Sequence, residues 1–308
     1  MSSVWGILLL FVTVLADPSK LLDIGINKHV DSRVRLPQQC AIAAAASRFS
    51  YNPVADDGPS KWTLAADCCV GEWQSPINIE IASCKCSQSH RIRYTTEPVG
   101  PIRGKLYNTG YAVSIDFSNS VSPALLGVPY WESSEYVLAQ LHFHAGNRTG
   151  HGSEHEVDSV GYDGELHLVH YKREYGSVSE AVKRHDGLAV VGIFLQLSHV
   201  SPNAEMNRLI RVCGLAGGKG NKIPFSVDVR QLFPWQKDFY AYHGSLTTPP
   251  CSESVRWMVM KDPVFISRDK LLILQSSRMS DGSYLGQHSN VRPVVPRAGR
   301  QVEANFHC

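Results

Sequence analysis

The stretch Gln140-Leu141-His142-Phe143-His144 lies in an apolar, β-prone segment and alternates with a period of two. Successive side chains of a strand point to opposite faces, so the glutamine and both histidines are expected on one face. Two imidazoles two positions apart on a strand can converge on one metal ion. By itself the pattern is equally typical of two hydrogen-bonded histidines on a half-buried strand, so the rest of the chain has to decide.

A third histidine candidate lies in the later stretch Glu165-Leu166-His167-Leu168-Val169. The same alternation puts Glu165, His167 and Val169 on one face. A carboxylate beside a metal-bound imidazole can accept its distal N–H and fix its tautomer, and Gln140 can serve His142 in the same way. Three neutral nitrogen ligands leave a fourth tetrahedral position open, which is typical of catalytic rather than structural zinc.

Length and charge exclude several classes of protein. With 308 residues, 43% of them hydrophobic, the chain can bury a large core in one big domain or two ordinary ones. The formal net charge is +2, and the basic residues are scattered rather than clustered. Nothing therefore indicates a nucleic-acid partner.

The N-terminus predicts export. Residues 1–16 carry an apolar run that ends in Val14-Leu15-Ala16, which we interpret as a signal peptide cleaved after Ala16. The run is too short to cross a bilayer as a helix, and no lipid-anchor signal follows at the other end. Residues 17–48 would form an N-terminal extension. The mature protein is expected to be secreted and extracellular, without a membrane anchor.

Cysteine usage agrees with export. An even number of cysteines in an exported protein predicts disulfides. Cys84-x-Cys86 could also bind a metal through thiolates, but no second paired-cysteine motif completes such a site. Asn147-Arg148-Thr149 is the only N-glycosylation sequon, so Asn147 is a predicted glycosylation site. The eight cysteines are Cys40, Cys68, Cys69, Cys84, Cys86, Cys213, Cys251 and Cys308.

From residue 49 onward, short β-prone runs alternate with Gly, Pro, Asn and Asp. We expect an α+β, sheet-dominated fold, with residues 49–308 forming one domain around a large, mostly antiparallel twisted sheet with short peripheral helices. Asp163-Gly164 predicts a hairpin turn before the next strand. The expected strands are 112–117, 136–144, 165–171, 188–197 and 255–260. The expected helices are 178–185, 203–213 and 268–276, the last capped by Ser267.

Three further motifs complete the pattern: Gln74-Ser75-Pro76-Ile77-Asn78-Ile79, Gly152-Ser153-Glu154-His155 and Gly244-Ser245-Leu246-Thr247-Thr248-Pro249-Pro250. With the two histidine strands, they resemble the α-class carbonic anhydrases from about residue 50 to residue 306. The motifs occur in the order and spacing of that family, which makes coincidence negligible.

The resemblance implies a zinc enzyme for the reversible hydration of CO₂ to bicarbonate and a proton. Zn²⁺ would be bound by His142, His144 and His167. Thr247 would accept a hydrogen bond from the attacking hydroxide and donate one, through its own O–H, to an ionised Glu154. The partners that orient the three rings would be Gln140, Glu165 and Asn290. The side chains implied to contact substrate are Thr247, Thr248 and the apolar wall of Val169, Val190, Leu246, Val255 and Trp257, which suits a linear nonpolar molecule.

Two positions depart from the family. Tyr111 takes the place of the proton-shuttling histidine of the fastest members, and Ala145 stands where a tryptophan is usual. A phenol, with an unperturbed pKa of about 10, exchanges protons poorly near neutrality, whereas imidazole, at about 6.5, suits that task. We therefore expect an active enzyme whose turnover is limited by proton release. His243 is the nearest alternative shuttle by sequence.

Cys69 and Cys251 match the disulfide of the secreted and membrane-bound branch of the family. The six remaining cysteines allow 15 pairings, and the sequence does not choose among them. The extra cysteines and the extension resemble secreted invertebrate members such as those of mollusc shells, which implies bicarbonate supply for biomineralisation and association with the extracellular matrix. The alternative is a catalytically weak matrix or binding module on the same fold, against which the complete histidine triad argues.

Overall fold

The computed structural model describes residues 49–217 and 219–307. They belong to the larger of two units of the chain, Pro37–Cys308. The expected signal peptide and N-terminal extension lie outside the described residues, and so do Cys40 and Cys308.

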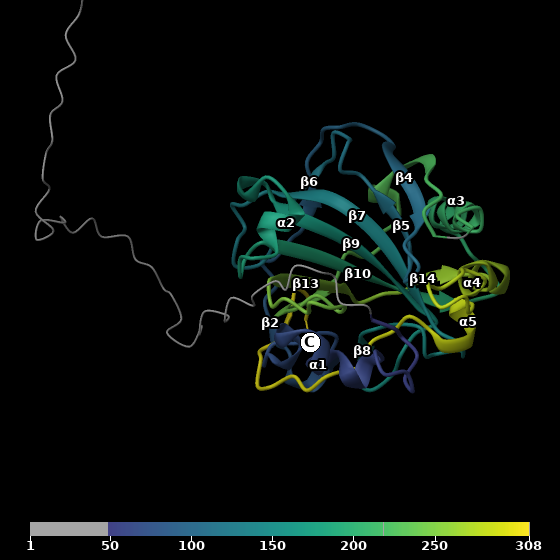
Figure 1. The fold of residues 1–308 in the computed structure, drawn as a ribbon. Helices are drawn as coiled ribbons and strands as arrows, with labels where there is room; N and C mark the ends of the chain where they lie inside the picture. The colour runs from purple at the N-terminus through teal and green to yellow at the C-terminus, as the bar shows by residue number, and fades with distance from the viewer. Residues whose placement is uncertain (1–48, 218, 308) are drawn as a thin grey trace, which may run out of the picture. The chain divides into compact units, whose positions relative to one another are not determined.

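A large twisted sheet of 13 strands dominates the fold (Figure 1). Its strands are β2 (Lys85–Cys86), β3 (Arg93–Tyr94), β4 (Ile102–Asn108), β5 (Val113–Asp116), β6 (Ala124–Leu126), β7 (Tyr136–Ala145), β9 (Gly164–Lys172), β10 (Leu188–Leu197), β11 (Ile223–Val227), β12 (Phe239–Gly244), β13 (Val255–Met260), β14 (Val264–Ile266) and β15 (Glu303–Ala304). The main order is β11-β4-β5-β7-β9-β10-β13-β12-β15-β2. Two short strands, β1 (Asn78–Ile79) and β8 (Glu156–Val157), form a separate pair.

The sheet is mixed. Most neighbouring strands run antiparallel, as expected, but β10 pairs in parallel with both β13 and β14, and β15 pairs in parallel with β2. The sheet-dominated α+β class expected from the sequence is confirmed. Parallel neighbours need a crossover connection, and here the chain from β10 to β13 passes through a helix and two further strands on the way.

The helices are short and peripheral. They are α1 (Trp62–Ala65), α2 (Val178–Ala181), α3 (Ala204–Cys213), α4 (Arg268–Gln275) and α5 (Leu285–His288), with 3₁₀ turns η1 (Pro59–Lys61), η2 (Asp67–Val70), η3 (Ile81–Ser83), η4 (Arg173–Tyr175) and η5 (Val229–Gln231). Asn203 caps α3 by accepting the N–H of Met206 at 2.9 Å. None of the helices in the described part of the chain is long and apolar enough to span a membrane.

Two local expectations were wrong. The helix expected over residues 178–185 ends at Ala181 and continues as turns. Asp163-Gly164 is not an exposed hairpin turn, because the Asp163 carboxylate is buried and accepts the N–H groups of Gly150 and Leu197. Gly164 already belongs to β9. An Asp side chain favours a turn by bonding to nearby backbone groups, and here the Asp163 carboxylate bonds to distant ones instead.

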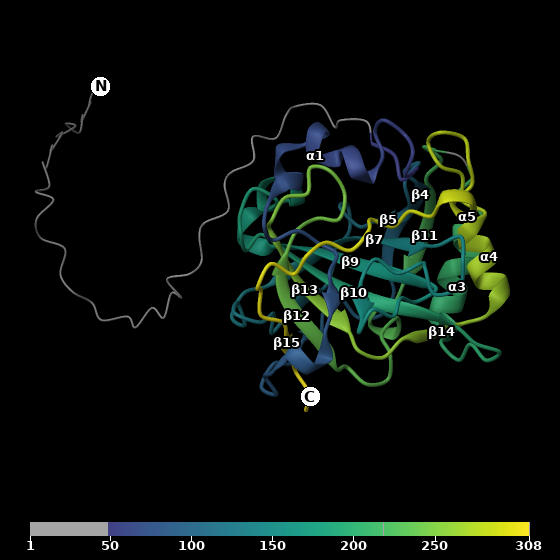
Figure 2. The ribbon, with the colours of Figure 1, turned by 90° about the horizontal axis from the view of Figure 1, so that it is seen from below.

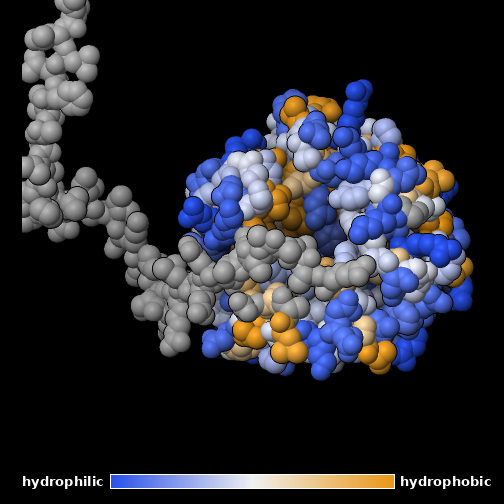
Figure 3. All heavy atoms as spheres, in the orientation of Figure 1, coloured by the Kyte–Doolittle hydropathy of each residue, from blue (hydrophilic) through white to orange (hydrophobic). Residues whose placement is uncertain are grey.

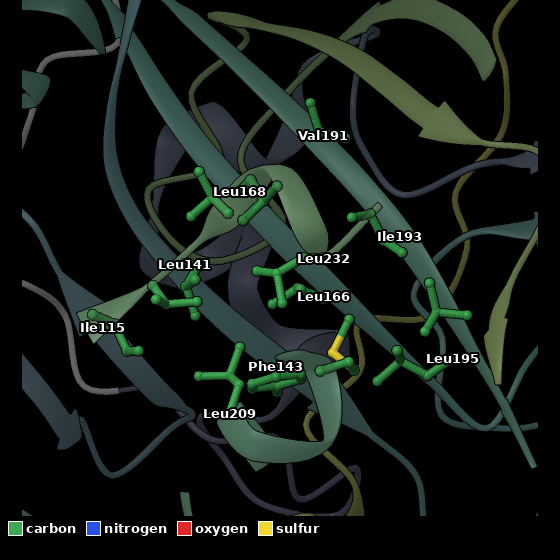
Figure 4. Packing of buried hydrophobic residues seen from close by; sticks show 14 of the residues in the cluster. Ile115, Leu141, Phe143, Leu166, Leu168, Val191, Ile193, Leu195, Leu209 and Leu232 are labelled. Carbon is green, nitrogen blue, oxygen red and sulfur yellow. The ribbon is translucent and has the colours of Figure 1, made fainter. Parts of the chain in front are cut away.

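One face of the sheet packs against α3 and η5 to form the main core (Figure 4). Alternate residues of β7, β9 and β10 point into it, and α3 and the turn after η5 cover them with Leu209 and Leu232. The sheet residues labelled in that view are Ile115, Leu141, Phe143, Leu166, Leu168, Val191, Ile193 and Leu195. Filling this face with apolar side chains leaves the opposite face free to carry polar groups.

Candidate metal centre

β7 and β9 bring the three predicted metal ligands together. In their antiparallel register His142 lies opposite His167, and His144 lies opposite Glu165. All three histidines are on the face opposite the main core, because their strand neighbours point into that core. Figure 3 shows a hollow over β9 and β10, where hydrophobic and hydrophilic residues meet.

A β-bulge in β7 decides which face the histidines occupy. The pairing with β9 shifts between Leu138 and Gln140, so Ala139 is an extra residue. As a result Leu138, before the bulge, lies in the same buried cluster as Leu141, after it. A strict period of two would have put Leu138 on the face of the histidines. The alternation that we read from the sequence therefore holds only on the C-terminal side of the bulge.

One nitrogen of each imidazole is fixed by a hydrogen bond. The acceptors belong to the three residues that were predicted to orient the rings, Gln140, Glu165 and Asn290. For Asn290 the acceptor is the main-chain oxygen. The contacts are His142 Nδ1 to Gln140 Oε1 (3.0 Å), His144 Nδ1 to Asn290 O (2.6 Å) and His167 Nε2 to Glu165 Oε1 (2.8 Å). Acceptors at these nitrogens leave the other nitrogen of each ring available as a metal ligand.

The remaining nitrogens converge on one point. Ligand atoms of His142, His144 and His167 all lie within 4.8 Å of one another. His144 Nε2 is buried and has no hydrogen-bond partner among the described residues. Burial lowers the pKa of all three imidazoles, that of His144 to about 4, so the rings are neutral near pH 7. Three neutral imidazoles, two of them buried and that of His142 half-buried, fit a Zn²⁺ ion with an open fourth position.

Glu165 anchors the neighbouring loop as well as a ligand. Its Oε2 accepts the N–H groups of Glu154 and His155, both at 2.9 Å, and its Oε1 contacts His155 Nδ1 at 2.8 Å. Burial alone would raise the pKa of Glu165, but His155 and His167 hold it well below its usual range. The other nitrogen of His155 lies 2.7 Å from the Tyr242 hydroxyl. Our sequence analysis gave His155 and Tyr242 no role, although His155 belongs to the Gly-Ser-Glu-His motif.

Glu154 and Thr247 meet beside the histidines. Glu154 Oε1 accepts the N–H of Arg292 at 2.9 Å, and its Oε2 lies 3.4 Å from His144 Nε2. Burial raises the pKa of Glu154 to about 7, while His167 and a hydrogen bond with Thr247 act in the opposite direction. The fold therefore brings the hydroxyl and the carboxylate together, as the resemblance to the family implied.

The loop that carries Thr247 is tied to the segment before β1. The predicted disulfide between Cys69 and Cys251 is confirmed, with an S–S distance of 2.03 Å. Gln74 Nε2 donates to the main-chain oxygen of Cys251 at 3.1 Å, and the N–H of Ser245 donates to Ser75 Oγ at 3.0 Å. The position of Thr247 therefore depends on residues from the start of the domain.

The predicted apolar wall lies on the histidine side of the sheet. The Trp257 ring is 4.8 Å from the His167 ring, centroid to centroid, and its N–H donates to the main-chain oxygen of Ser245. Thr248 is half-buried, and its main-chain oxygen accepts the N–H of Cys251. The wall belongs to a second buried cluster that includes Val169, Val190, Val255 and Trp257, with Leu246 packed against it.

Tyr111 is half-buried in an aromatic group. Its ring stacks on Phe49 with centroids 4.1 Å apart, and its main-chain oxygen accepts Asn290 Nδ2 at 3.0 Å. The same Asn290 orients His144, so position 111 is linked to a ligand through one residue. Phe49 was not singled out from the sequence, because a lone aromatic at the start of a domain carries no motif.

His243 lies away from these residues. Its ring packs edge-on against Trp73 at 5.0 Å, and its Nε2 contacts the main-chain oxygen of Glu253. Burial lowers the pKa of His243 to about 3, so the ring stays neutral at physiological pH. These contacts and the lowered pKa argue against His243 as the proton shuttle near neutrality.

The other singled-out residues are structural or peripheral. Asn147 is exposed, as a glycosylation site requires, and contacts the main-chain oxygen of Gln287. Ala145 is buried in the main core. Neither Cys84 nor Cys86 belongs to any potential metal-binding group in the described part of the chain.

Comparison with known proteins points the same way as the geometry. The sequence model of the eukaryotic-type carbonic anhydrase family matches residues 57–306. The chain is 37% identical to human carbonic anhydrase 7 over 259 residues, 82% of this chain and 96% of that protein. It is 34% identical to mouse carbonic anhydrase 1 over 268 residues, 85% of this chain and 100% of that protein.

Proposed function

The chain belongs to the eukaryotic-type carbonic anhydrase family and is a zinc-dependent carbonate dehydratase, and from this premise we propose how its residues act and where it works. His142, His144 and His167 would hold the ion. Bound zinc lowers the pKa of a water to about 7, a value for which carbonic anhydrase is itself the reference case. The unpartnered, buried His144 Nε2 is the observation that carries the assignment.

Thr247 would select and orient the attacking oxygen. A hydroxyl can donate only one hydrogen bond, and here Glu154 would accept it. Thr247 would then have only its lone pairs left for the metal side, so it would accept a hydrogen bond from the attacking oxygen and fix the direction in which that oxygen's own lone pair points. The Arg292 N–H stabilises the ionised form of Glu154 that this arrangement needs.

The apolar wall would hold CO₂ beside that oxygen. Val190 and Trp257 are buried, and they offer the nonpolar molecule an apolar surface with which water forms few hydrogen bonds. Thr248 would contact bicarbonate at the polar edge of this surface. Neutral CO₂ and charged bicarbonate would thus meet different sides of one site.

Proton release would limit turnover. In our proposal Tyr111 occupies the shuttle position without serving as an efficient shuttle, and buffer molecules carry the proton away. The half-buried stack of Tyr111 on Phe49 supports a fixed rather than a swinging side chain.

We also propose that the protein is secreted and glycosylated at Asn147. The Cys69–Cys251 disulfide supports an oxidising compartment. In that setting the enzyme would supply bicarbonate for mineral deposition in association with an extracellular matrix. The convergence of the three imidazoles argues against the alternative, a catalytically weak binding module.

The test is stopped-flow CO₂ hydration by the secreted, zinc-loaded protein, before and after dialysis against a zinc chelator. Activity should be lost with the metal and restored by one equivalent of zinc. Activity that survives complete removal of zinc would contradict the proposal, and a zinc-loaded protein without activity would favour the binding module.

A further inference from the structure

A cavity of about 790 Å³ lies between the N-terminal part of the domain and the chain that follows α5. Its walls come from residues 51–74 and 288–298, and none of the three metal ligands lines it. Figure 2 shows the two segments that meet here, the one that carries α1 and the yellow C-terminal chain that crosses the domain from α5. A cavity of this size can hold a small organic molecule.

One positively charged side chain is built into the wall of this cavity. Arg292 is only 6% exposed, and its Nη1 donates to Gln74 Oε1 at 3.0 Å and to the main-chain oxygen of Ser75 at 2.8 Å. The described residues offer no acceptor to Nε or Nη2, and neither atom is fully buried, so both face the cavity. Their N–H groups lie side by side on the planar guanidinium. This is the edge that holds a carboxylate through two parallel hydrogen bonds.

No carboxylate pairs with this guanidinium within the described residues. Glu154 bonds to the main-chain N–H of Arg292, not to its side chain. Glu253 lies nearby but accepts Gln74 Nε2 at 3.0 Å. Glu72 lines the cavity, but its side chain is exposed, and solvent and salt weaken its field there. The cavity thus presents a buried positive charge without an anionic partner, which favours an anionic ligand.

The remainder of the wall is largely apolar. Val70 and Val294 both line the cavity and are 66% and 39% exposed, respectively. Pro53 and Pro296 extend this surface. The fixed φ of proline keeps such a wall rigid, so a ligand orders little chain when it binds. Exposed apolar side chains gathered at a concave site are typical of a surface that contacts the apolar part of a ligand.

We propose that this cavity binds a small organic anion, a carboxylate on an aromatic or branched apolar body. Nε and Nη2 of Arg292 hold the carboxylate, and the apolar body covers Val70 and Val294. The main-chain N–H of Arg292 bonds to Glu154, so the anion binds one residue away from the Glu154–Thr247 pair without entering the metal site. The binding requires no zinc, so a failure of this proposal would leave the proposed enzyme activity unaffected.

Titration of the zinc-loaded protein with 2-naphthoate, followed by amide NMR shifts, tests the proposal. Signals of Val70, Gly71, Val294 and Val295 should shift, whereas those of β7 and β9 should stay in place. The neutral 2-naphthamide, which has the same ring system, should bind at least about tenfold more weakly because it cannot form charge-assisted bonds with the guanidinium. Shifts centred on β7 and β9 would show that the carboxylate goes to the metal and would overturn the proposal. Equal affinities of the two compounds, or no shift up to the solubility limit, would also overturn it.

Three variants locate the ligand within the cavity. Val294→Asp places a carboxylate in the exposed part of the wall and should weaken 2-naphthoate binding at least about tenfold. Val99→Asp, at an exposed valine outside the cavity, is the matched control and should bind normally. Arg292→Lys keeps the charge but loses the paired N–H groups, and it should also weaken binding at least about tenfold once circular dichroism shows that it is folded. Unchanged affinity in Val294→Asp, or in a folded Arg292→Lys, would contradict the proposed site.

Discussion

Tyr111 lies ring on ring with Phe49, the centroids 4.1 Å apart and the planes 13° from parallel. The main-chain oxygen of Tyr111 is held at the same time by Asn290, which also orients the metal-side ligand His144. Position 111 is thus linked to a metal ligand through Asn290. Whether this position can transfer protons depends on which side chain occupies it.

Replacing Tyr111 with histidine should speed proton release. We expect Tyr111→His to raise kcat in weak, non-imidazole buffer by roughly an order of magnitude, because an imidazole exchanges protons near neutral pH. The measurement is stopped-flow CO₂ hydration over a range of buffer concentrations. Tyr111→Phe, which keeps the stack on Phe49, should leave kcat unchanged, and imidazole buffer should raise kcat of the unmodified enzyme. No gain in Tyr111→His would show that another group already carries the proton.

Thr247→Ala should cost about 100-fold in kcat/KM, because the attacking oxygen loses the acceptor that orients it. Zinc content should stay at one ion per chain, since Thr247 is not among the three converging ligands. Thr247→Ser keeps the hydroxyl beside Glu154 and should retain most of the activity. Equal losses in the alanine and serine variants would argue that packing, not the hydroxyl, matters here.

Glu165→Gln should weaken zinc binding by about 10- to 100-fold, because His167 loses its charged partner. Competition with a fluorescent chelator measures this affinity. Glu156→Gln, one residue beyond the loop that Glu165 holds, is the matched control and should bind zinc normally. Since Glu165 also anchors the N–H groups of that loop, circular dichroism should first show that the variant is folded. A folded Glu165→Gln variant that binds zinc with unchanged affinity would show that Glu165 does not orient His167 for the metal.

Asp186 should make stability depend on pH. Its carboxylate accepts hydrogen bonds from Lys172 and Tyr175, which lower its pKa although burial opposes this. Asp186→Asn should reduce the free energy of unfolding at pH 7 by about 1 to 2 kcal/mol. A folded-state pKa below the unfolded value means that this contribution is present above about pH 4 and is lost as the pH falls through the folded pKa.

Urea unfolding at pH 7 and at pH 3 measures that difference. The gap between the unmodified protein and Asp186→Asn should shrink at the lower pH. Glu174→Gln, which removes only the exposed partner of Lys172, should change stability by less than about 0.5 kcal/mol at either pH. A gap that stays constant with pH would show that the hydrogen bonds, not the charge, stabilise the native state.

Sequence alone predicted the central strands and the face that carries the histidines. Both follow from the alternation of side chains between the two faces of a sheet, which leaves a period of two in the sequence. β10 (Leu188–Leu197) and β13 (Val255–Met260) have the predicted bounds. The bulge at Ala139 escaped prediction because an extra residue leaves no mark on local composition. The turn expected at Asp163 failed because a tertiary contact buried the carboxylate.

The metal ligands were found because they come with motifs. The residues that support them were found less completely, because Phe49, His155 and Tyr242 act through contacts between distant segments. The argument against His243 as a shuttle also needed the three-dimensional structure, because the contacts that lower its pKa come from segments distant in sequence.

The most direct test of the account is zinc stoichiometry and CO₂-hydration activity of His144→Ala beside His151→Ala, an exposed histidine in the following loop. We predict that His144→Ala binds far less than one zinc per chain and loses at least about 1,000-fold in kcat/KM, while His151→Ala keeps both. Near-normal activity in a folded His144→Ala would contradict the zinc centre on which the account rests.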